Sequence, residues 1–332
     1  MGIDLVTGGA GFIGSHLVDV LIAKGHKVRV VDNFAVGGMR NIVQHDGNPA
    51  LEVVQADISD KSLIAGCFEG VERVFHLAAM ADIVPSIEDP EVYFRANVNG
   101  TLNVVQASVA NNVKRFVYVA SSSCYGIPDV YPTPEDAPNQ PQYPYAMTKN
   151  LGEQIVLHWS SVYNLPALSL RFFNVYGPRV RTSGTYGAVF GVFLAQLLAG
   201  KPLTIVGNGM QSRDFTYVSD VVDALICAAD SEQSGQIYNV GTGEAQSVNR
   251  LVELLGAKDV VYIPERPGEP ERTLADINKV RSELGWQAKV SFAEGVGIML
   301  ENIDYWRDAP VWTVGTIAEA TAGWFKYLQA KK

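Results

Sequence analysis

Tyr145 and Lys149 are the residues whose types and spacing most directly suggest chemistry. Residues four apart share one face of a helix, so the lysine ammonium can lie beside the phenol. A free tyrosine has a pKa of roughly 10 and is a poor base at neutral pH. Lowering that value by roughly three units takes about 4 kcal/mol of preferential stabilisation of the phenolate. A nearby cation contributes to this, and Ser121, at the end of an expected strand, can hydrogen-bond the same substrate oxygen. The three residues predict proton transfer at an alcohol.

A glycine-rich turn near the N-terminus predicts a dinucleotide site. Gly8, Gly11 and Gly14 have the spacing Gly-x-x-Gly-x-x-Gly between an expected strand and an expected helix. Glycine permits the tight turn and the close approach of backbone to a pyrophosphate, and the helix N-terminus adds oriented N–H groups. Asp32 ends the next expected strand, where a carboxylate accepts hydrogen bonds from ribose hydroxyls and repels a 2′-phosphate. These residues favour NAD over NADP, and with Tyr145 they predict hydride chemistry on an alcohol carbon. We expect the Lys149 ammonium and the positive nicotinamide ring of bound NAD⁺ to stabilise the Tyr145 phenolate jointly.

Short apolar strands alternate with helical stretches through the first half of the chain. We expect strands at 3–6, 27–31, 51–55, 73–77 and 116–120, and the first helix at 15–24. This alternation predicts an α/β fold with a Rossmann-type doubly wound parallel sheet. Ligands in such sheets bind beyond the C-terminal ends of the strands, and the candidate residues lie at or just after such ends.

The later part of the chain has a less regular pattern. We expect a long loop at 126–144, a helix near 188–199 and a strand near 203–206, and we read 264–286 as polar and loop-like before a final helix. The domain prediction is an NAD-binding domain at 1–175, to which some later segments return. A smaller C-terminal α/β lobe, mainly 176–332, would bind the substrate.

Composition excludes several other classes of protein. The chain has 332 residues and a net charge of −9, which argues against nucleic acid as a partner. Its three cysteines show neither a metal-ligand nor a disulfide pattern, so we expect no metal. No apolar run reaches membrane-spanning length, and the fold begins almost at the N-terminus, so we expect no membrane partner and a cytoplasmic location.

In these motifs the chain resembles the extended short-chain dehydrogenase/reductase family, in its NAD-dependent nucleotide-sugar epimerase/dehydratase branch. The resemblance lies in segments 7–14, 76–79, 97–103, 121–126, 145–149, 171–179, 211–215 and 266–269. It implies that Tyr145 takes the proton of the sugar 4-hydroxyl while the C4 hydride passes to NAD⁺. The resemblance, together with the strand ends, assigns the cofactor to Gly8, Gly11, Phe12, Ile13, Asp32, Asn33, Asp57, Ile58, Leu77, Ala78, Ala79, Asn97, Tyr145 and Lys149.

The fate of the 4-ketose separates the reactions of this branch. An epimerase returns the hydride to the opposite face of the sugar, whereas the 4,6-dehydratases carry an Asp-Glu pair after the serine and the decarboxylases a Glu. Here these positions are Ser122 and Ser123, whose hydroxyls are poor acids and bases. This departure favours a UDP-sugar 4-epimerase over a dehydratase or decarboxylase. Cys124 beside the site is interpreted as a packing residue.

The resemblance also indicates where a UDP-sugar would bind. It gives the diphosphate to Asn174, Arg213 and Arg266, the ribose to Glu269, and a size gate beside the hexose to Thr273. Segment 176–181, which ends in Arg181, is similar to that of glucuronate epimerases. The full expected substrate set is Ser122, Ser123, Asn174, Arg181, Val206, Arg213, Arg266, Glu269 and Thr273. Glucose or galactose, an N-acetylhexosamine and glucuronate all stay open.

Two rival functions and two further features complete the predictions. A non-catalytic NAD-binding module is disfavoured by the intact Ser121, Tyr145 and Lys149, and a reductase using NADPH is disfavoured by Asp32. The resemblance implies a homodimer, formed through helices within 92–110 and 147–161. The aromatic tail at 305–325 either caps the lobe or contacts a partner subunit.

Overall fold

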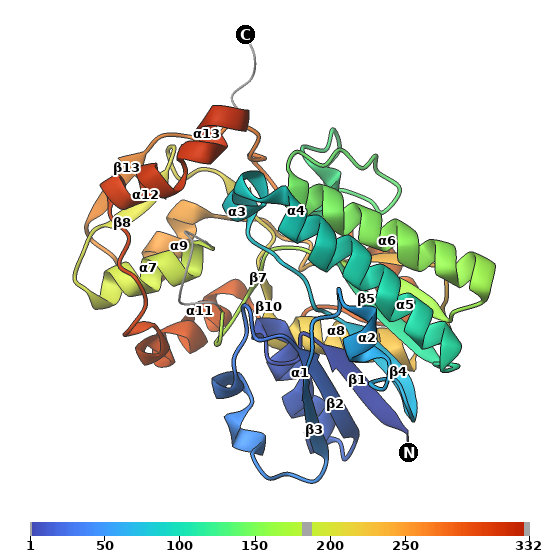
Figure 1. The fold of residues 1–332 in the computed structure, drawn as a ribbon. Helices are drawn as coiled ribbons and strands as arrows, with labels where there is room; N and C mark the ends of the chain where they lie inside the picture. Colours follow the sequence, from blue (N-terminus) through green and yellow to red (C-terminus); the bar gives the residue numbers. More distant parts are fainter. Residues whose placement is uncertain (1, 181–187, 329–332) are drawn as a thin grey trace.

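A parallel sheet of seven strands organises the molecule (Figure 1). The computed structural model describes residues 2–180 and 188–328. The strands run in the order β3-β2-β1-β4-β5-β6-β11, and every pair is parallel. Their bounds are β1 Ile3–Thr7, β2 Lys27–Asp32, β3 Leu51–Gln55, β4 Val71–His76, β5 Arg115–Ser121, β6 Ala167–Phe172 and β11 Ile237–Val240. The strand order reverses between β1 and β4, where ligands of doubly wound sheets bind. This confirms the predicted Rossmann-type sheet.

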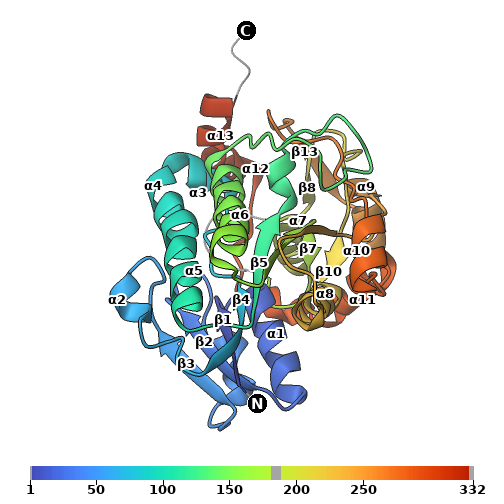
Figure 2. The ribbon, with the colours of Figure 1, turned by 90° about the vertical axis from the view of Figure 1, so that its right-hand side faces the viewer.

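Helices cover both faces of the sheet. Figure 2 shows the sheet between α1 and α8 on one side and α5 and α6 on the other. Leu17 of α1 and Leu225 of α8 belong to one buried apolar cluster, and Val104 of α5 and Val156 of α6 belong to another. The helices are α1 Phe12–Ala23, α2 Lys61–Ile64, α3 Ile83–Glu88, α4 Pro90–Tyr93, the π-helix η3 Phe94–Asn99, α5 Gly100–Ala110, α6 Pro144–Tyr163 and α8 Val218–Asp230.

A smaller lobe beside the sheet has its own core, which includes the buried residues Phe190, Phe193, Phe215 and Trp306. Its strands form three short pairs, β7 Val175–Tyr176 with β10 Thr216–Tyr217, β8 Leu203–Val206 with β13 Val260–Ile263, and β9 Ser212–Arg213 with β12 Gln246–Ser247. The later helices are α7 Val189–Leu198, α9 Val248–Leu254, α10 Asn278–Leu284, α11 Phe292–Glu301, α12 Val314–Ala320 and α13 Ala322–Leu328. Short 3-10 turns are η1 Met39–Asn41, η2 Val43–His45, η4 Ser122–Tyr125 and η5 Ile303–Trp306.

The predicted helices and strands agree best with the structure where the local sequence pattern determines the secondary structure. The strand predicted at 203–206 is β8, and no helix or strand interrupts 126–143. The reading of 264–286 as loop was wrong, because α10 lies within it and buries Val280. The single final helix was also wrong, because α11, α12 and α13 follow. The strand β11 comes from the second half of the chain and pairs with β6 in the main sheet. The predicted domain boundary at residue 175 stays a prediction.

The described residues contain neither a membrane-spanning helix nor a metal-binding cluster. Within 2–180 and 188–328, no helix has the length and apolar character needed to cross a bilayer. The same residues contain no cluster of three or more His, Cys, Asp or Glu side chains placed to hold a metal ion.

Candidate active site

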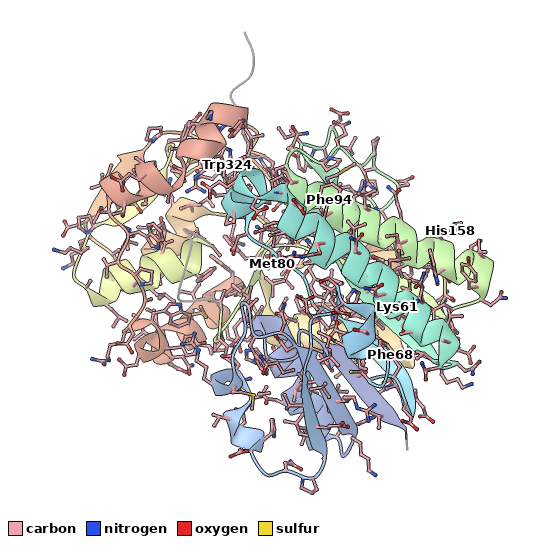
Figure 3. The ribbon with its side chains drawn as sticks, viewed as in Figure 1. Lys61, Phe68, Met80, Phe94, His158 and Trp324 are labelled. Atoms are coloured by element: carbon pink, nitrogen blue, oxygen red, sulfur yellow. The ribbon has the colours of Figure 1, made fainter. Side chains whose placement is uncertain are left out.

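A cavity of about 600 Å³ contains most of the predicted ligand-binding residues. From the cofactor set its walls include Gly8, Gly11, Phe12, Ile13, Asp32, Asn33, Asp57, Ile58, Leu77, Ala78 and Ala79, and from the substrate set Asn174, Val206, Arg213, Arg266 and Glu269. Met80, a further wall residue, lies between the sheet and the lobe in Figure 3. The cavity has the size usual for a small-molecule site. The structure thus places two sets of residues, far apart in the sequence, on one cavity.

The glycine turn needs its glycines for geometric reasons. Gly8 has φ +71°, and a Cβ there would lie 2.8 Å from the backbone nitrogen of Ala78. A Cβ on Gly14 would collide with the carbonyl oxygen of Gly8, so α1 can pack this closely on the turn only with glycine. Gly11 is the N-cap of α1 and supplies no side-chain cap, so no side chain covers the helix N-terminus there. A turn of this shape at a helix N-terminus fits a pyrophosphate.

Asp32 ends β2 and is held by backbone. Its Oδ2 accepts a hydrogen bond from the Ala10 N–H at 3.0 Å, and its Oδ1 accepts one from the Phe34 N–H at 2.8 Å. Burial raises the pKa of this carboxyl, and the two backbone hydrogen bonds oppose that rise. Each carboxylate oxygen can accept a second hydrogen bond. The group therefore has room for two ribose hydroxyls. The next residue, Asn33, donates from its amide to Oδ2 of Asp57 at 3.2 Å.

The proton-transfer residues lie at the junction of β5 and α6. Tyr145 and Lys149 are in the first turns of α6, as predicted, and Ser121 ends β5. Lys149 is buried, with its Nζ 4.4 Å from the centre of the Tyr118 ring. Burial lowers the pKa of Lys149 to about 8.

The prediction that Lys149 and the nicotinamide ring of bound NAD⁺ jointly lower the pKa of the Tyr145 phenol stays a prediction, and the protein groups alone act in the opposite direction. Burial raises the pKa of Tyr145 to about 12, and the hydrogen bond to Ser121 only partly opposes this. Cys124 and Asp82 raise the pKa further. The phenol therefore requires an additional positive charge nearby to act as a base near neutral pH. A positively charged nicotinamide ring is a group of that kind, so the residues fit NAD⁺.

Several predicted residues do not line the cavity. Ser121, Ser122, Ser123, Asn97 and Thr273 are not among its wall residues, and neither are Tyr145 and Lys149. Arg181 lies outside the described residues. The roles of all of these in ligand binding stay predictions.

Asn97 and Thr273 have well-defined partners that hold wall residues in place. The Asn97 amide binds both the N–H and the carbonyl of Met80, at 2.8 and 2.9 Å, and donates to the Thr148 hydroxyl on α6. The Thr273 hydroxyl donates to Oδ1 of Asn174 at 2.7 Å and accepts from the Asp214 N–H at 3.2 Å. Thr273 thus fixes the side chain of Asn174.

Two residues near the site are structural. His76 is buried with its ring nitrogens 2.7 and 2.9 Å from the hydroxyls of Thr7 and Thr101, and burial lowers its pKa to about 3. His76 is therefore a hydrogen-bonded core residue. Cys124 is fully buried, and burial raises the pKa of its thiol to about 12, in keeping with a packing role.

A buried ion pair lies one helical turn beyond Lys149. Glu153 accepts from Nη2 of Arg171 at 2.5 Å and from the hydroxyl of Ser169 at 2.8 Å. The Arg171 guanidinium lies over the Tyr125 ring at 4.6 Å. Sequence reasoning missed this pair, although Lys149 and Glu153 repeat the spacing of four found between Tyr145 and Lys149.

Charged side chains gather at the substrate end of the cavity. Nη2 of Arg213 lies 2.8 Å from Oε1 of Glu269, and Nη1 of Arg266 lies 3.7 Å from Oε2 of the same carboxylate. Guanidinium groups bind phosphate oxygens in a two-pronged geometry. Glu269 thus holds both cations at one place on the wall, which suits a diphosphate.

Some wall residues were not predicted. Met80 and Asp82 follow β4, and Trp312 and Trp324 come from the C-terminal segment. The strand end at His76 was the signal for the first two. The aromatic tail was noted in the sequence, but no pattern there indicates contact with a cavity.

The fold and the site together define an enzyme that uses a dinucleotide cofactor. Residues 5–241 match the model of the NAD dependent epimerase/dehydratase family. A UDP-glucose 4-epimerase from Mycolicibacterium smegmatis is 39% identical over 304 residues, which cover 90% of this chain and 97% of that protein. The chain therefore belongs to the NAD-dependent epimerase/dehydratase family, and its cofactor is NAD.

Two further relatives show the range of the family. The crystal structure of a UDP-glucose 4-epimerase from Thermotoga maritima with UDP-glucose is 35% identical and superposes with a TM-score of 0.85, covering 92% of this chain and 99% of that one. A UDP-N-acetyl-alpha-D-glucosaminuronate decarboxylase from Bacillus cytotoxicus is 31% identical, over 92% of this chain and 97% of that protein. Family membership alone thus leaves the reaction and the sugar undecided.

Proposed function

We propose that the protein is a UDP-sugar 4-epimerase, an isomerase that works through a transient 4-keto sugar. The observation that carries this proposal is the turn that follows Ser121. Residues 122–124 of this turn are Ser, Ser and Cys, and they include no carboxylate. Burial keeps the Cys124 thiol protonated by raising its pKa to about 12. An elimination or a decarboxylation would lack its acid and base at these positions, whereas an epimerisation needs neither.

Tyr145 and Ser121 handle the proton of the sugar 4-hydroxyl. When bound, NAD⁺ would supply a positive charge near the phenol and a reversible hydride acceptor for C4 of the sugar. Tyr145 takes the hydroxyl proton as the ketone forms and gives it back when the alcohol is restored, so atoms and electrons balance with no net oxidation. Ser121 holds the sugar oxygen beside the phenol.

Inversion requires the ketose to present its other face, so the diphosphate must stay bound while the sugar turns. Arg213 and Arg266 on the lobe side of the cavity suit this tethering role.

UDP-glucose and UDP-galactose are the first substrates to test, because relatives with 39% and 35% identity are named UDP-glucose 4-epimerase. UDP-N-acetylhexosamine and UDP-glucuronate are the other candidates. Thr273 would leave room for an acetamido group, although its hydroxyl is bound to Asn174.

A lyase reaction of the same fold is the second candidate. Asp82 lines the cavity close enough to Tyr145 to raise the pKa of the phenol, so one carboxylate is present near the reacting oxygen. The relative from Bacillus cytotoxicus is named a decarboxylase, so a lyase reaction is the alternative to test.

The test is an incubation of purified protein, without added cofactor, with each of the three UDP-sugars. Proton NMR of the anomeric region follows the product. A mixture approaching the 4-epimer supports the proposal and names the sugar. A 4-keto-6-deoxy sugar or a pentose would assign the lyase reaction instead and would show that the serines do not prevent it.

We also propose a homodimer formed through α5 and α6, in the cytoplasm. The two helices lie side by side on one face of the sheet (Figure 2). The large side chains of Met147, Val162 and Tyr163 are exposed on α6. Light scattering of the purified protein gives its mass directly. A Met147→Glu variant should lower that mass if this face forms the contact.

A further inference from the structure

The last helices of the chain reach from the lobe to the sheet domain. We call residues 309–328 the C-terminal strap. Its first part is fixed to the lobe, because Gln196 of α7 donates to the carbonyl of Trp312 at 2.8 Å and Ile317 of α12 is buried in the lobe core. Its last helix, α13, packs against α3, which follows β4 in the sheet domain (Figure 1). The strap therefore spans the two parts that form the cavity.

Trp324 is the residue of α13 that turns inward. It is 3% exposed and lines the cavity, and Figure 3 shows it between α13 and α3. Its indole N–H donates to the carbonyl of Pro267 at 2.6 Å. The ring centre of Tyr143, two residues before the predicted base, lies 6.2 Å from that of Trp324.

Trp324 also contacts a predicted phosphate ligand. The Arg266 guanidinium carbon lies 5.6 Å from the centre of the indole ring, within the range of a cation–π interaction. The hydrogen bond to Pro267 fixes the backbone of the residue after Arg266. Trp324 thus restrains Arg266 in two ways, through the neighbouring backbone and through contact with the arginine side chain. Arginine loses less freedom on binding phosphate when it is already oriented.

We propose that the C-terminal strap is part of the sugar-nucleotide site, and that Trp324 is a positioning residue that orients Arg266 toward the diphosphate. This role rests on the proposed function, in which Arg266 binds the diphosphate of a UDP-sugar.

Variants of the full-length protein test the proposal, with UDP as the probe and calorimetry as the readout. Trp324→Ala should weaken UDP binding by about tenfold, which corresponds to about 1.4 kcal/mol. Bound NAD should be unchanged, because the contacts of Trp324 described above are to Arg266, Pro267 and Tyr143, which are not in the predicted cofactor set. Trp324→Phe keeps an aromatic face and should lose less. Tyr327→Ala is the matched control, because Tyr327 lies on the same helix with 60% of its surface exposed.

Trp324→Leu guards against a loss of folding, because it keeps apolar bulk without the aromatic face. In an Arg266→Ala background the Trp324→Leu change should have little further effect on UDP binding, since the two residues act through one contact. Equal UDP affinity of wild type, Trp324→Ala and Trp324→Leu would overturn the positioning role. Additive losses of UDP affinity in the Arg266→Ala, Trp324→Leu double variant would overturn it as well. Failure of the wild-type protein to bind UDP would instead overturn the proposed function, and the strap's role with it.

Discussion

Replacing Ser121 by alanine should raise the pKa of the Tyr145 phenol and slow the reaction at neutral pH. Burial raises this pKa to about 12, and among the described groups that act on the phenol the hydrogen bond to Ser121 lowers it. The Ser121 oxygen already accepts from the backbone N–H and the hydroxyl of Ser123, at 3.2 and 2.9 Å. Its own hydrogen is therefore directed outward, and can be donated to the phenolate.

The size of the effect follows from the strength of a hydrogen bond to an ionised group. Such a bond contributes about 1.5–3 kcal/mol. Its loss corresponds to a rise of about one to two pKa units in the Tyr145 phenol. Because the base must be deprotonated, the acid limb of the rate profile moves to higher pH by the same amount. Below that limb we expect the rate of the Ser121→Ala variant to fall by about 10- to 150-fold.

Two measurements on the NAD-bound protein check this expectation. Ultraviolet titration, taken as the difference from the same protein carrying Tyr145→Phe, reports ionisation of this one phenol. The initial rate is then measured across the same pH range. Ser121→Thr keeps the hydroxyl and should resemble wild type. An unchanged phenol pKa in Ser121→Ala, or an equal rise in Ser121→Thr, would refute the reasoning.

Three further perturbations have outcomes that follow from single contacts. Asp32→Asn should weaken NAD binding by about 10- to 100-fold through the loss of charged hydrogen bonds, and should reduce discrimination against NADP; calorimetry with both cofactors measures this, and an unchanged preference would contradict it. His76 has a folded pKa of about 3 against 6.5 unfolded. The unfolded chain therefore binds the extra proton as the pH falls through 6.5, so wild type should lose about 2 kcal/mol of unfolding free energy by pH 5. His76→Gln should lack this loss, and the exposed His158→Gln should retain it. Arg171→Met should cost about 3–5 kcal/mol in urea unfolding because it leaves the Glu153 carboxylate buried and unpaired, whereas the double variant with Glu153→Gln should regain much of it.

The sequence was sufficient wherever a short segment determines both structure and chemistry. Gly8 and Gly14 mark a turn whose shape only glycine allows, and Asp32 is placed by the end of a strand. The spacing of Tyr145 and Lys149 required only that their segment be helical, which it is. Each of these inferences depends on neighbours within about one helical turn or one strand.

The sequence was not sufficient where distant segments decide the outcome. The pKa of the Tyr145 phenol in the protein alone depends on how deeply this residue is buried, and the sequence does not show that burial. The helix α10 was read as loop because its single buried side chain, Val280, gives no periodic pattern. Trp324 and Arg266 are 58 positions apart, and only the folded chain shows that their side chains meet.

The buried ion pair of Glu153 and Arg171 is best explained by its effect on the relative position of two elements, rather than by its contribution to stability. An ion pair removed from water contributes little net stability, because desolvation offsets the attraction. This one nevertheless joins α6 to β6, while the Arg171 guanidinium contacts the ring of Tyr125 in the turn after Ser121. The Tyr125 hydroxyl in turn donates to Asn239 of β11 at 2.7 Å. The chain of contacts thus fixes the helix that carries Tyr145 and Lys149 relative to the strand end that carries Ser121. Proton transfer depends on that separation to a fraction of an ångström. A buried charge pair can specify such a separation because both partners lose much more free energy if they move apart than an apolar pair would.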